Sequence, residues 1–543
     1  MTVDAVVVGA GHNGLVAANL LADAGWDVVV CEAADTPGGA VASAEVTAPG
    51  FRTDLFSAFY PLAVASPVLN ALDLGSYGVS WARAPAVLAH LLPDGRSATL
   101  WQDPAQTAAS LAKFGAADGE AWLRITAQWD RIGDAVVQAL LSPFPPVAAV
   151  GRLLRRLGVD ELLRLARMAA QPVRRFGEEN FAGPGGPILF AGNALHADLP
   201  PDGAGSALYG WLLAMLGHSY GFPVPVGGAD VLIKGLVRRL EAKGGQLRLS
   251  ARVDKIVVSS GAARAVVLQS GERIDARRAV LADVAAPALF DKLVGIDDLP
   301  RRFVADLRHF QWDAPTVKID WAVGAPVPWT DPDARKAGTV HLGVDMDGLT
   351  DYAADLSTRR IPRAPFVLFG QMTTADPTRS PAGTESAWAY THLPRGVDFT
   401  ADDIARHVEK VEAVVEAHAP GFRAAVLARH VQAPADLQRR DANLVDGAIN
   451  GGTAQLHQQL VFRPVPGLGN AVTPVDRLYL AGSSAHPGGG VHGAPGANAA
   501  HAALARERVT GGARHAFQAA LLRRIYRDGA LAGLDSQDSS ANR

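Results

Sequence analysis

The stretch Val6-Val7-Val8-Gly9-Ala10-Gly11-His12-Asn13-Gly14 stands near the start of the 543-residue chain and decides how its first part folds. It closes a short apolar strand and opens a segment over 13–24 with helical periodicity. A second apolar strand over 27–31 completes the β-α-β order of a dinucleotide-binding unit. In such a unit the three glycines permit, in order, a tight turn, close approach of the backbone to a pyrophosphate, and close packing of helix on strand.

Glu32 follows the second strand and narrows the choice of cofactor. A carboxylate at this place accepts hydrogen bonds from ribose hydroxyls and repels a 2′-phosphate. The sequence therefore disfavours NADP and leaves NAD and FAD. The pair Gly38-Gly39 supplies a second stretch of flexible backbone behind Glu32, which suits the larger FAD.

Composition excludes several classes of function. Apolar residues make up 48% of the chain and charged residues 19%, which is typical of a globular protein. The formal charge of −3 gives no sign of a nucleic-acid partner. Because Cys31 is the single cysteine, the chain forms no redox-active or structural disulfide and no cysteine-rich metal site. We predict no metal site, and we expect Cys31 to be a small buried side chain.

Localisation is predicted from the absence of targeting signals. No signal-peptide pattern precedes the first strand, and the longest apolar stretch, 207–217, is too short to span a bilayer. We therefore expect an intracellular, cytoplasmic protein, soluble or peripheral to a membrane. The stretch 207–217 is expected either to line an apolar substrate cavity or to belong to the core.

A basic helical pair over 147–176 has two interpretations. It contains seven arginines: 152, 155, 156, 164, 167, 174 and 175. Within the pair, only Asp160 and Glu161 oppose them. The pair is either a solvated outer face or a surface that docks on an anionic membrane.

The chain is expected to divide into a nucleotide-binding part that is split in sequence and a separate substrate-binding part. The nucleotide-binding pattern resumes at Val226-Gly227-Gly228 and again at Leu478. Long alternating strands from residue 310 onward predict an antiparallel sheet. The expected segments are FAD-binding over 1–75, 223–300 and 471–512, a mainly helical insertion over 76–222, an antiparallel-sheet substrate domain over 301–470, and a C-terminal helix with a disordered tail over 513–543.

Three separated blocks resemble one family: residues 9–39, residues 224–228 with the following helix and strand, and residues 478–500. Together they resemble the phytoene desaturase-like branch of the flavin amine oxidase superfamily. Asp376-Pro377 and Ser380-Pro381-Ala382-Gly383 look closer still to the pyridine nucleotide-disulphide oxidoreductase domain-containing protein 2 group. The resemblance implies an α/β fold, with an FAD-binding Rossmann domain of the glutathione-reductase type and an antiparallel sheet with helices over the substrate.

The resemblance also implies non-covalent FAD and a set of residues around it. Gly9, Gly11 and Gly14 would hold the pyrophosphate and Glu32 the adenosine ribose. The other implied contacts are Gly38 and Gly39 to the phosphates, Val253 to the adenine, Gly482 to the ribityl side, and Gly489, Gly490 and Val491 to the pyrimidine end of the flavin. Ser483 departs from the acidic residue that many relatives carry after Gly482.

The function implied by the resemblance is removal of a hydride from an apolar, isoprenoid or other lipid-like substrate, as in a desaturase or dehydrogenase. A flavin-dependent isomerase or amine oxidase is an alternative, and so is a non-catalytic carrier or interaction protein on the same fold. No second nucleotide motif appears, so we expect oxygen or a quinone as electron acceptor. His486 and His492, in the terminal glycine-rich loop, are the candidate catalytic residues.

Overall fold

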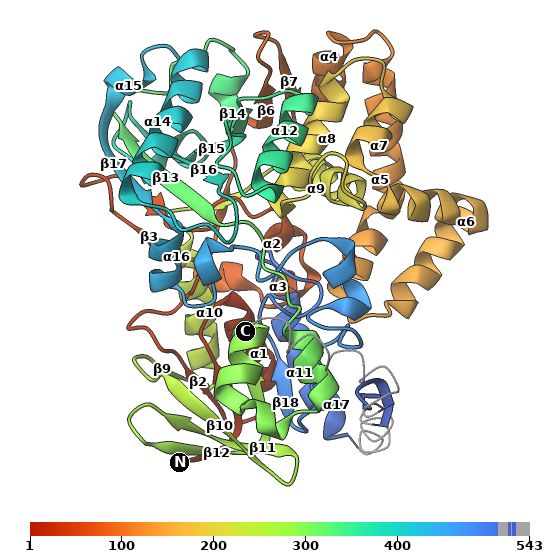
Figure 1. Cartoon of the computed structure of the whole chain (residues 1–543), viewed down its shortest axis with the longest axis vertical. Coiled ribbons are helices and arrows are strands. Elements are labelled where there is room, and N and C mark those ends of the chain that lie inside the picture. Colours follow the sequence, from red (N-terminus) through yellow and green to blue (C-terminus); the bar gives the residue numbers. More distant parts are fainter. Residues whose placement is uncertain (509–517, 519, 523, 528–543) are drawn as a thin grey trace, which may run out of the picture.

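The computed structural model describes residues 1–508, 518, 520–522 and 524–527. Two large sheets stand one above the other, and most of the helices lie beside the upper sheet (Figure 1). Most of the C-terminal helix and disordered tail expected over 513–543 lies outside the described residues.

The first sheet begins with the predicted β-α-β unit. Strand β1 (Thr2–Val8), helix α1 (His12–Asp23) and strand β2 (Val28–Cys31) follow the expected order, and the two strands are parallel neighbours. The whole sheet has the order β10-β11-β12-β1-β2-β9, with β18 beside β12. The added strands are β9 (Gln246–Arg248), β10 (Val253–Ser259), β11 (Ala262–Leu268), β12 (Arg273–Ala282) and β18 (Leu478–Leu480). Strands from three distant parts of the chain therefore form one sheet.

Both faces of this sheet are covered. Ala5 and Val7 of β1 pack toward α1, α10 (Asp230–Ala242) and α17 (Ala494–Arg506). Val6 and Val8 pack in a second cluster with Phe290 and with residues of α11 (Arg301–Leu307). Burial on both faces explains the unbroken apolar run of β1, because a strand with one wet face would alternate.

The second sheet has the order β17-β13-β16-β15-β14-β6-β7. Its strands are β6 (Ala86–Leu91), β7 (Ser97–Leu100), β13 (Thr316–Val323), β14 (Ala337–Leu342), β15 (Val367–Gln371), β16 (Glu385–His392) and β17 (Val426–Gln432). Two features differ from the expected antiparallel sheet. Strands β6 and β7 come from the segment expected to be mainly helical, and β6 pairs with β14 in parallel. All six residues of β6 are buried, so the strand lacks the alternation that would have revealed it.

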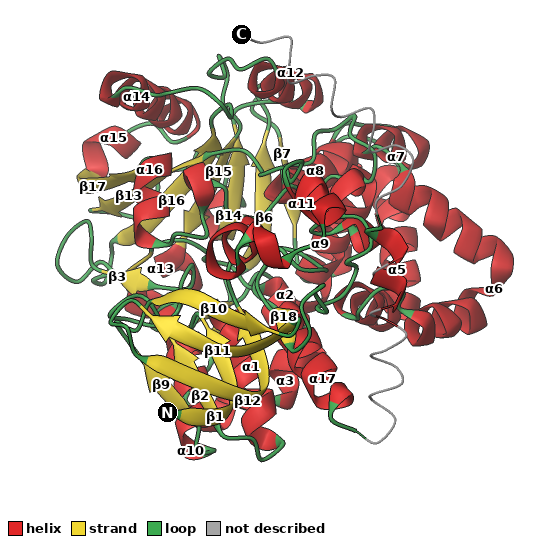
Figure 2. Cartoon of the chain, turned by 60° about the horizontal axis from the view of Figure 1, so that its bottom comes forward, coloured by secondary structure: helices red, strands yellow, loops and turns green. Residues whose placement is uncertain are grey.

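Helices cover the two faces of the second sheet. The predicted helix near 401–417 is α14 (Ala401–His418), and its Val408, Val411 and Val415 pack with Ile319 and Trp321 of β13. On the other face lie α5 (Asp118–Leu141), α8 (Gly185–Ala194) and α9 (Ser206–Tyr220). Figure 2 shows α6 (Val147–Ala170) projecting from this helical side. Gly158, at φ +78°, divides α6 into two helices, as its sequence indicates.

The apolar side chains of 207–217 that suggested a substrate cavity do not line one. Ala207, Trp211, Ala214 and Met215 are all buried. Helix α9 is apolar on all sides and packs between α8 and α5, where Trp211 meets Trp129 edge to face at 5.1 Å. A helix without a polar face is a core helix, so this stripe belongs to the core.

One buried arginine joins the two sheets. The guanidinium of Arg379 donates to Asp54 Oδ1 at 2.8 Å, to Asp376 Oδ2 at 2.9 Å and to the Pro225 carbonyl at 3.1 Å. Asp376 also accepts the backbone N–H of Gly227. A buried charge is tolerated only when it is paired, so this network fixes the junction between the nucleotide-binding pattern at 224–228 and the second sheet.

Candidate functional site

The turn between β1 and α1 is as tight as its glycines require. Gly9 has φ +95°, and a Cβ there would lie 2.7 Å from the carbonyl oxygen of Asp283. A Cβ at Gly14 would lie 2.3 Å from the Gly9 carbonyl oxygen, and one at Gly11 would lie 2.5 Å from Asp283 Oδ2. The N-terminus of α1 carries no side-chain cap at Gly11. Open backbone N–H groups at a helix start suit an anion such as a pyrophosphate.

The other residues predicted for the adenosine half lie beside this turn. The Glu32 carboxylate accepts the backbone N–H groups of Ala10, at 2.7 Å, and Ala34, at 2.8 Å. Gly38 donates its N–H to the Ala10 carbonyl at 2.9 Å. A Cβ at Gly39 would lie 3.7 Å from Gly11 Cα. The structure thus brings together Glu32, both glycines and the turn.

Two further carboxylates lie here that the sequence did not single out. Asp283 directly follows β12, and its Oδ2 accepts the Gly14 N–H at 2.8 Å. Burial raises the pKa of Asp283 to about 7, and the charges of Asp441 and Glu32 act in the same direction. Burial also raises the pKa of Asp441, whose Oδ2 would lie 3.2 Å from a Cβ at Gly39. The only sequence signal was an acidic residue at the end of an apolar strand.

The terminal glycine-rich block meets the same place. A Cβ at Gly496, in the first turn of α17, would lie only 1.9 Å from the carbonyl oxygen of Asn13 in α1. The two helices therefore start side by side. A Cβ at Gly482 would lie 3.1 Å from Asp283 Oδ1. His12, for which the sequence suggested no role, ties α1 to the loop, because its Nε2 lies 3.2 Å from the Gly490 carbonyl.

The remaining predicted cofactor residues occupy defined places. A Cβ at Gly489 would lie 2.7 Å from the carbonyl oxygen of Asn450, and Gly490 has φ +116°. Val491 packs in the cluster that holds α1 and α17. Val253 is the first residue of β10, and it is buried on the opposite face of the first sheet. Cys31 is buried, as expected, and burial raises the pKa of its thiol to about 11.

The two candidate catalytic histidines make structural contacts. His492 Nδ1 accepts the N–H of Ala494 at 3.1 Å, at the start of α17. His486 Nε2 lies 3.1 Å from the carbonyl oxygen of Ser142. Burial lowers the pKa of His492 to about 3 and that of His486 to about 4. Both rings are therefore neutral near pH 7, and a catalytic role for either stays a prediction.

The second sheet presents buried polar groups that no sequence motif connects. His392 Nε2 and Asp198 Oδ1 lie 2.6 Å apart, and both side chains are nearly buried. Asp198 Oδ2 accepts the Asn450 side-chain amide at 3.2 Å, and Asn450 is also the neighbour of Gly489. The negative charge of Asp198 raises the pKa of His392, although burial opposes it. Lys318 and Asp320 form a second buried ion pair on β13.

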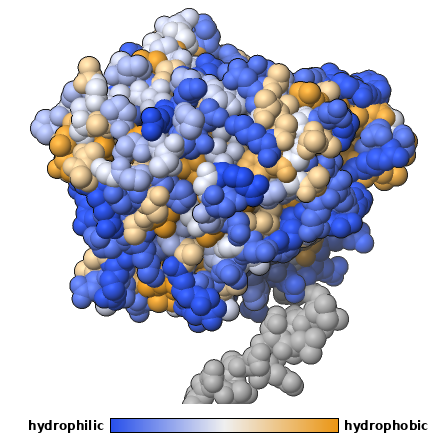
Figure 3. All heavy atoms as spheres, turned by 90° about the horizontal axis from the view of Figure 1, so that it is seen from above, coloured by the Kyte–Doolittle hydropathy of each residue, from blue (hydrophilic) through white to orange (hydrophobic). Residues whose placement is uncertain are grey.

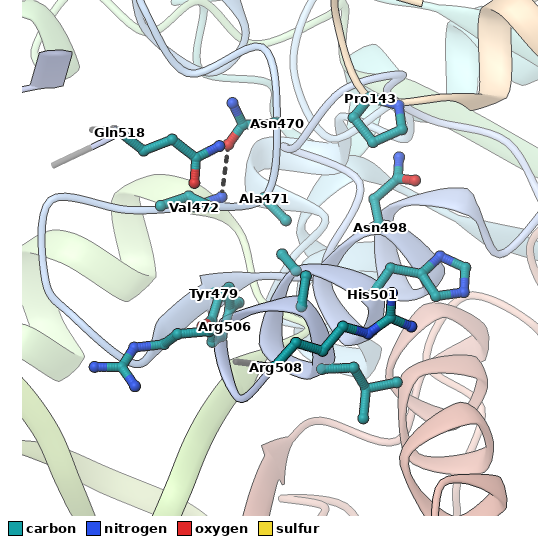
Figure 4. A pocket seen from close by; sticks show the side chains of 13 residues that line it. Pro143, Asn470, Ala471, Val472, Tyr479, Asn498, His501, Arg506, Arg508 and Gln518 are labelled. Carbon is teal, nitrogen blue, oxygen red and sulfur yellow. Dashed lines mark hydrogen bonds between the residues drawn. The ribbon is translucent and has the colours of Figure 1, made fainter. Parts of the chain in front are cut away.

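Metal binding and membrane crossing find no support in the described residues. These residues contain no group of three histidine, cysteine or acidic side chains placed to hold a metal ion. Their helices are also too short or too polar to cross a bilayer. A hollow of about 350 Å³ lies between α17 and the segment 470–472, and Asn470, Asn498 and His501 are among the residues that line it (Figure 4). None of the predicted cofactor residues lines that hollow.

Known proteins similar to this chain agree on a flavin fold. Residues 14–307 match the family model described as flavin containing amine oxidoreductase. The chain is 31% identical to pyridine nucleotide-disulfide oxidoreductase domain-containing protein 2 of Rattus norvegicus, over 92% of each chain. It is 25% identical to a phytoene desaturase (neurosporene-forming) of Rhodobacter capsulatus, over 90% of this chain and 91% of that one. It is also 25% identical to a phytoene desaturase (lycopene-forming) of Pseudescherichia vulneris, over 92% and 98%.

Solved structures share the fold at lower sequence identity. An oxidoreductase from Methanosarcina mazei superposes with a TM-score of 0.61 at 16% identity, over 93% of this chain and all of that one. A putrescine oxidase bound to putrescine superposes with a TM-score of 0.60 at 15% identity, over 93% and 98%. These likenesses support the fold, a pair of sheets with helices typical of FAD-dependent oxidoreductases.

Asp283 should make stability depend on pH. Its pKa of about 7 in the folded protein lies above the ordinary 3.8, so the stability it contributes is full below about pH 4 and is lost as pH rises through 7. Each pH unit between these values costs the wild type about 1.4 kcal/mol. Asn at 283 is uncharged and still accepts the Gly14 N–H. We expect Asp283→Asn to raise the Tm of the FAD-free protein at pH 8 more than at pH 5.

Thermal melts at several pH values measure this difference. Asp275→Asn is the matched control, because the side chain of Asp275 is 44% exposed and pairs with Arg273. Parallel curves of Tm against pH for wild type and Asp283→Asn would contradict the assignment.

Proposed function

Because the chain belongs to the flavin-containing amine oxidoreductase family, we propose that this FAD-dependent oxidoreductase removes a hydride from an apolar, lipid-like substrate. It is phytoene desaturase-like and is similar to the pyridine nucleotide-disulphide oxidoreductase domain-containing protein 2 group. When bound, FAD supplies the hydride acceptor. The protein must hold the substrate against it and exclude water.

The residues around the β1–α1 turn fit FAD. The space left by the missing side chains of Gly9, Gly11 and Gly14 lets the backbone approach a pyrophosphate at the start of α1. Glu32, oriented by two backbone N–H groups, would accept from the adenosine ribose. Val253 is proposed beside the adenine, Gly38 and Gly39 beside the phosphates, and Gly482, Gly489, Gly490 and Val491 along the ribityl chain and flavin.

We assign the first sheet with α1, α10 and α17 to FAD and the second sheet with its helices to the substrate. The first unit is split in sequence over 1–75, 223–300 and 471–512. The substrate unit combines 301–470 with the insertion 76–222, because β6 and β7 of the insertion belong to the second sheet. The site then lies where the two units meet, which is a common place for a ligand pocket.

An apolar hollow beside the glycine-rich loop carries the proposal of an apolar substrate. Its volume is about 660 Å³, and it lies between the start of α6 and the segment 461–472. Most of its lining is apolar: Pro143, Phe144, Pro145, Pro146, Val147, Ala148, Ala149, Val461, Val472, Leu521 and Leu522. Ser142 on its rim contacts His486, and the neighbouring Leu141 contacts Asn498 of α17. The similarity to two phytoene desaturases reported above also favours isoprenoid chemistry.

Helix α6 is the proposed surface for a membrane that delivers such a substrate. Val147, Val159 and Leu163 are 72%, 65% and 65% exposed. Figure 3 shows apolar and polar side chains interleaved at the edge where α6 projects. The sequence expectation that only Asp160 and Glu161 oppose the arginines of 147–176 is corrected by partners from other helices and loops. Ion pairs join Arg156 to Asp134, Arg164 to Asp160 and Glu161, Arg167 to Glu179, Arg174 to Asp202 and Asp347, and Arg175 to Glu178 and Glu179.

Apolar contact is therefore the main force proposed for docking. Five of the seven arginines are paired with carboxylates, so their charge contributes little to attraction by an anionic membrane. Salt, which screens charge, should therefore remove only a part of the membrane binding. The electron acceptor is proposed to be oxygen or a quinone, and a membrane quinone would reach the same surface.

A substrate with a polar group is the second candidate. The buried Asp198–His392 pair connects through Asn450 to Gly489 of the terminal loop. A charged pair in this place favours an amine or a hydroxy compound as the substrate. A pure hydrocarbon offers no polar group to the pair, and buried charge without polar partners is costly. Amine oxidation and polyene isomerisation are the reactions to test against hydride removal from an apolar chain.

Glu32→Ala should weaken FAD binding. The variant loses a charged acceptor worth about 1.5–3 kcal/mol, so the FAD dissociation constant should rise roughly 10- to 150-fold. Flavin fluorescence titration of the FAD-free protein measures it. Asp35→Ala, at an exposed neighbouring carboxylate, is the control and should bind like wild type. Acid precipitation of the holoprotein should release the yellow chromophore, and a pellet that stays yellow would contradict non-covalent binding.

Anaerobic bleaching of the bound flavin identifies the substrate class. We expect bleaching by a carotenoid precursor or a monoterpene in detergent, and none by a panel of amines and alcohols. Ala148→Glu places a charge in the apolar hollow and should slow that bleaching at least tenfold with unchanged FAD content. Ala105→Glu, at an exposed site on another helix, should not. Bleaching by an amine or alcohol alone would replace the first candidate by the second.

Liposome co-sedimentation tests the role of α6. Wild type should bind anionic vesicles, with only a modest loss as salt rises. The double variant Val159→Asp/Leu163→Asp should lose binding, because it places charge on the exposed apolar positions. Leu427→Asp, at a site 64% exposed on β17, should bind like wild type. Equal binding by all three proteins would show that α6 is an ordinary solvated face.

A further inference from the structure

Arg463 is a buried cation next to the glycine-rich loop. Its side chain is almost completely buried, and among the described residues its guanidinium forms no ion pair and donates instead to backbone carbonyls. The guanidinium donates to the carbonyls of Ser483 at 2.8 Å, Thr453 at 2.9 Å, and Asn450 and Gly451 at 3.1 Å. Burial lowers its pKa to about 10, which still leaves it charged near neutral pH. Burying a cation without an ion-pair partner is costly, so the burial of Arg463 requires an explanation.

Asp313 lies on the opposite side of the same backbone segment. Its carboxylate accepts the N–H groups of Ile449 at 2.6 Å, Asn450 at 2.9 Å and Gly452 at 3.2 Å. The carbonyls of the segment 449–453 thus point to Arg463, whereas its N–H groups point to Asp313. The two charges are held apart by one layer of oriented peptide groups, and together they form a fixed dipole.

The positive end of this dipole adjoins the loop proposed to contact the flavin. Gly488 has φ +115°, which favours glycine, and a Cβ there would lie 3.1 Å from Arg463 Cζ, which is a tight contact. Gly489, Gly490 and Val491 follow directly, and α17 begins at Ala494. The negative end lies toward Asp198. Burial raises the pKa of Asp313, and the charge of Asp198 acts in the same direction. The helix start adds positive potential on the same side as Arg463.

We propose that Arg463 supplies the fixed positive charge that favours negative charge on the flavin, and that Asp313 opposes it. This inference rests on the proposed place of the flavin at residues 489–491. The charge acts through space in a site from which water is largely excluded, where Coulomb interactions are strong. Arg463 therefore raises the reduction potential of the flavin and its affinity for nucleophilic anions. This role is additional to the hydrogen bonds by which Arg463 holds 449–453 and Ser483 together.

Sulfite is the probe, because it adds its electron pair to oxidised flavin and leaves the negative charge on the ring. Loss of the visible flavin absorbance gives the dissociation constant without any substrate. We expect wild type to bind sulfite reversibly at pH 8. Arg463→Met should weaken binding about tenfold or more, which for a two-electron couple corresponds to about 30 mV. Arg463→Lys keeps the charge and should stay within about threefold of wild type.

Asp313→Asn provides the test of direction. Removing the opposing negative charge should strengthen sulfite binding. If Arg463 and Asp313 had only a structural role, substitution of either residue would weaken sulfite binding. The flavin reduction potential should move in the same order, lowest in Arg463→Met and highest in Asp313→Asn.

Three outcomes would overturn the inference: no sulfite bleaching in wild type, equal weakening in Arg463→Met and Arg463→Lys, or weaker binding in Asp313→Asn. If Arg463→Met fails to retain FAD, wild type, Arg463→Lys and Asp313→Asn still decide the question. A wild type that carries no FAD would instead refute the proposed function.

Discussion

The rest of the structure depends on the contact between the starts of α1 and α17. Gly496 brings the two helices so close that a Cβ would lie 1.9 Å from the Asn13 carbonyl oxygen. Gly14 likewise lets α1 pack closely on the turn after β1, because a Cβ there would lie 2.3 Å from the Gly9 carbonyl oxygen. Both helix starts therefore point to one place, although their sequences lie almost the whole chain apart. Helix starts favour negative charge, and FAD has it at the pyrophosphate and, when reduced, on the flavin ring.

The charges around this contact differ from one end to the other. At the pyrophosphate side Glu32, Asp283 and Asp441 lie close together, and burial raises the pKa of the last two. A raised pKa favours the uncharged form of a carboxyl, and this form would weaken the repulsion of a phosphate held there. At the other end Arg463 supplies a buried cation without an ion-pair partner among the described residues. Both features lie where the cofactor is expected.

Two different surfaces lie near the proposed site. Toward α6 lies the apolar hollow, and its rim touches His486 of the glycine-rich loop. On the sheet itself lies the buried Asp198–His392 pair, which reaches the same loop through Asn450. An apolar substrate with one polar or proton-releasing group would use both. The two surfaces converge because the insertion contributes both Asp198 and the residues 138–149 that line the hollow.

The sequence by itself determined the local units and the cofactor class. The β-α-β unit with Glu32 depends on glycine geometry and hydrophobic periodicity within about thirty residues, and such short-range rules can be read from one chain. It did not reveal β6, because a strand buried on both faces lacks alternation, or the core position of α9, because an all-apolar helix has no face to orient. Only the tertiary structure decided that Asp283, Asp441, His392 and Arg463 surround the proposed site. Their roles come from burial and from neighbours far along the chain, and no local pattern encodes those.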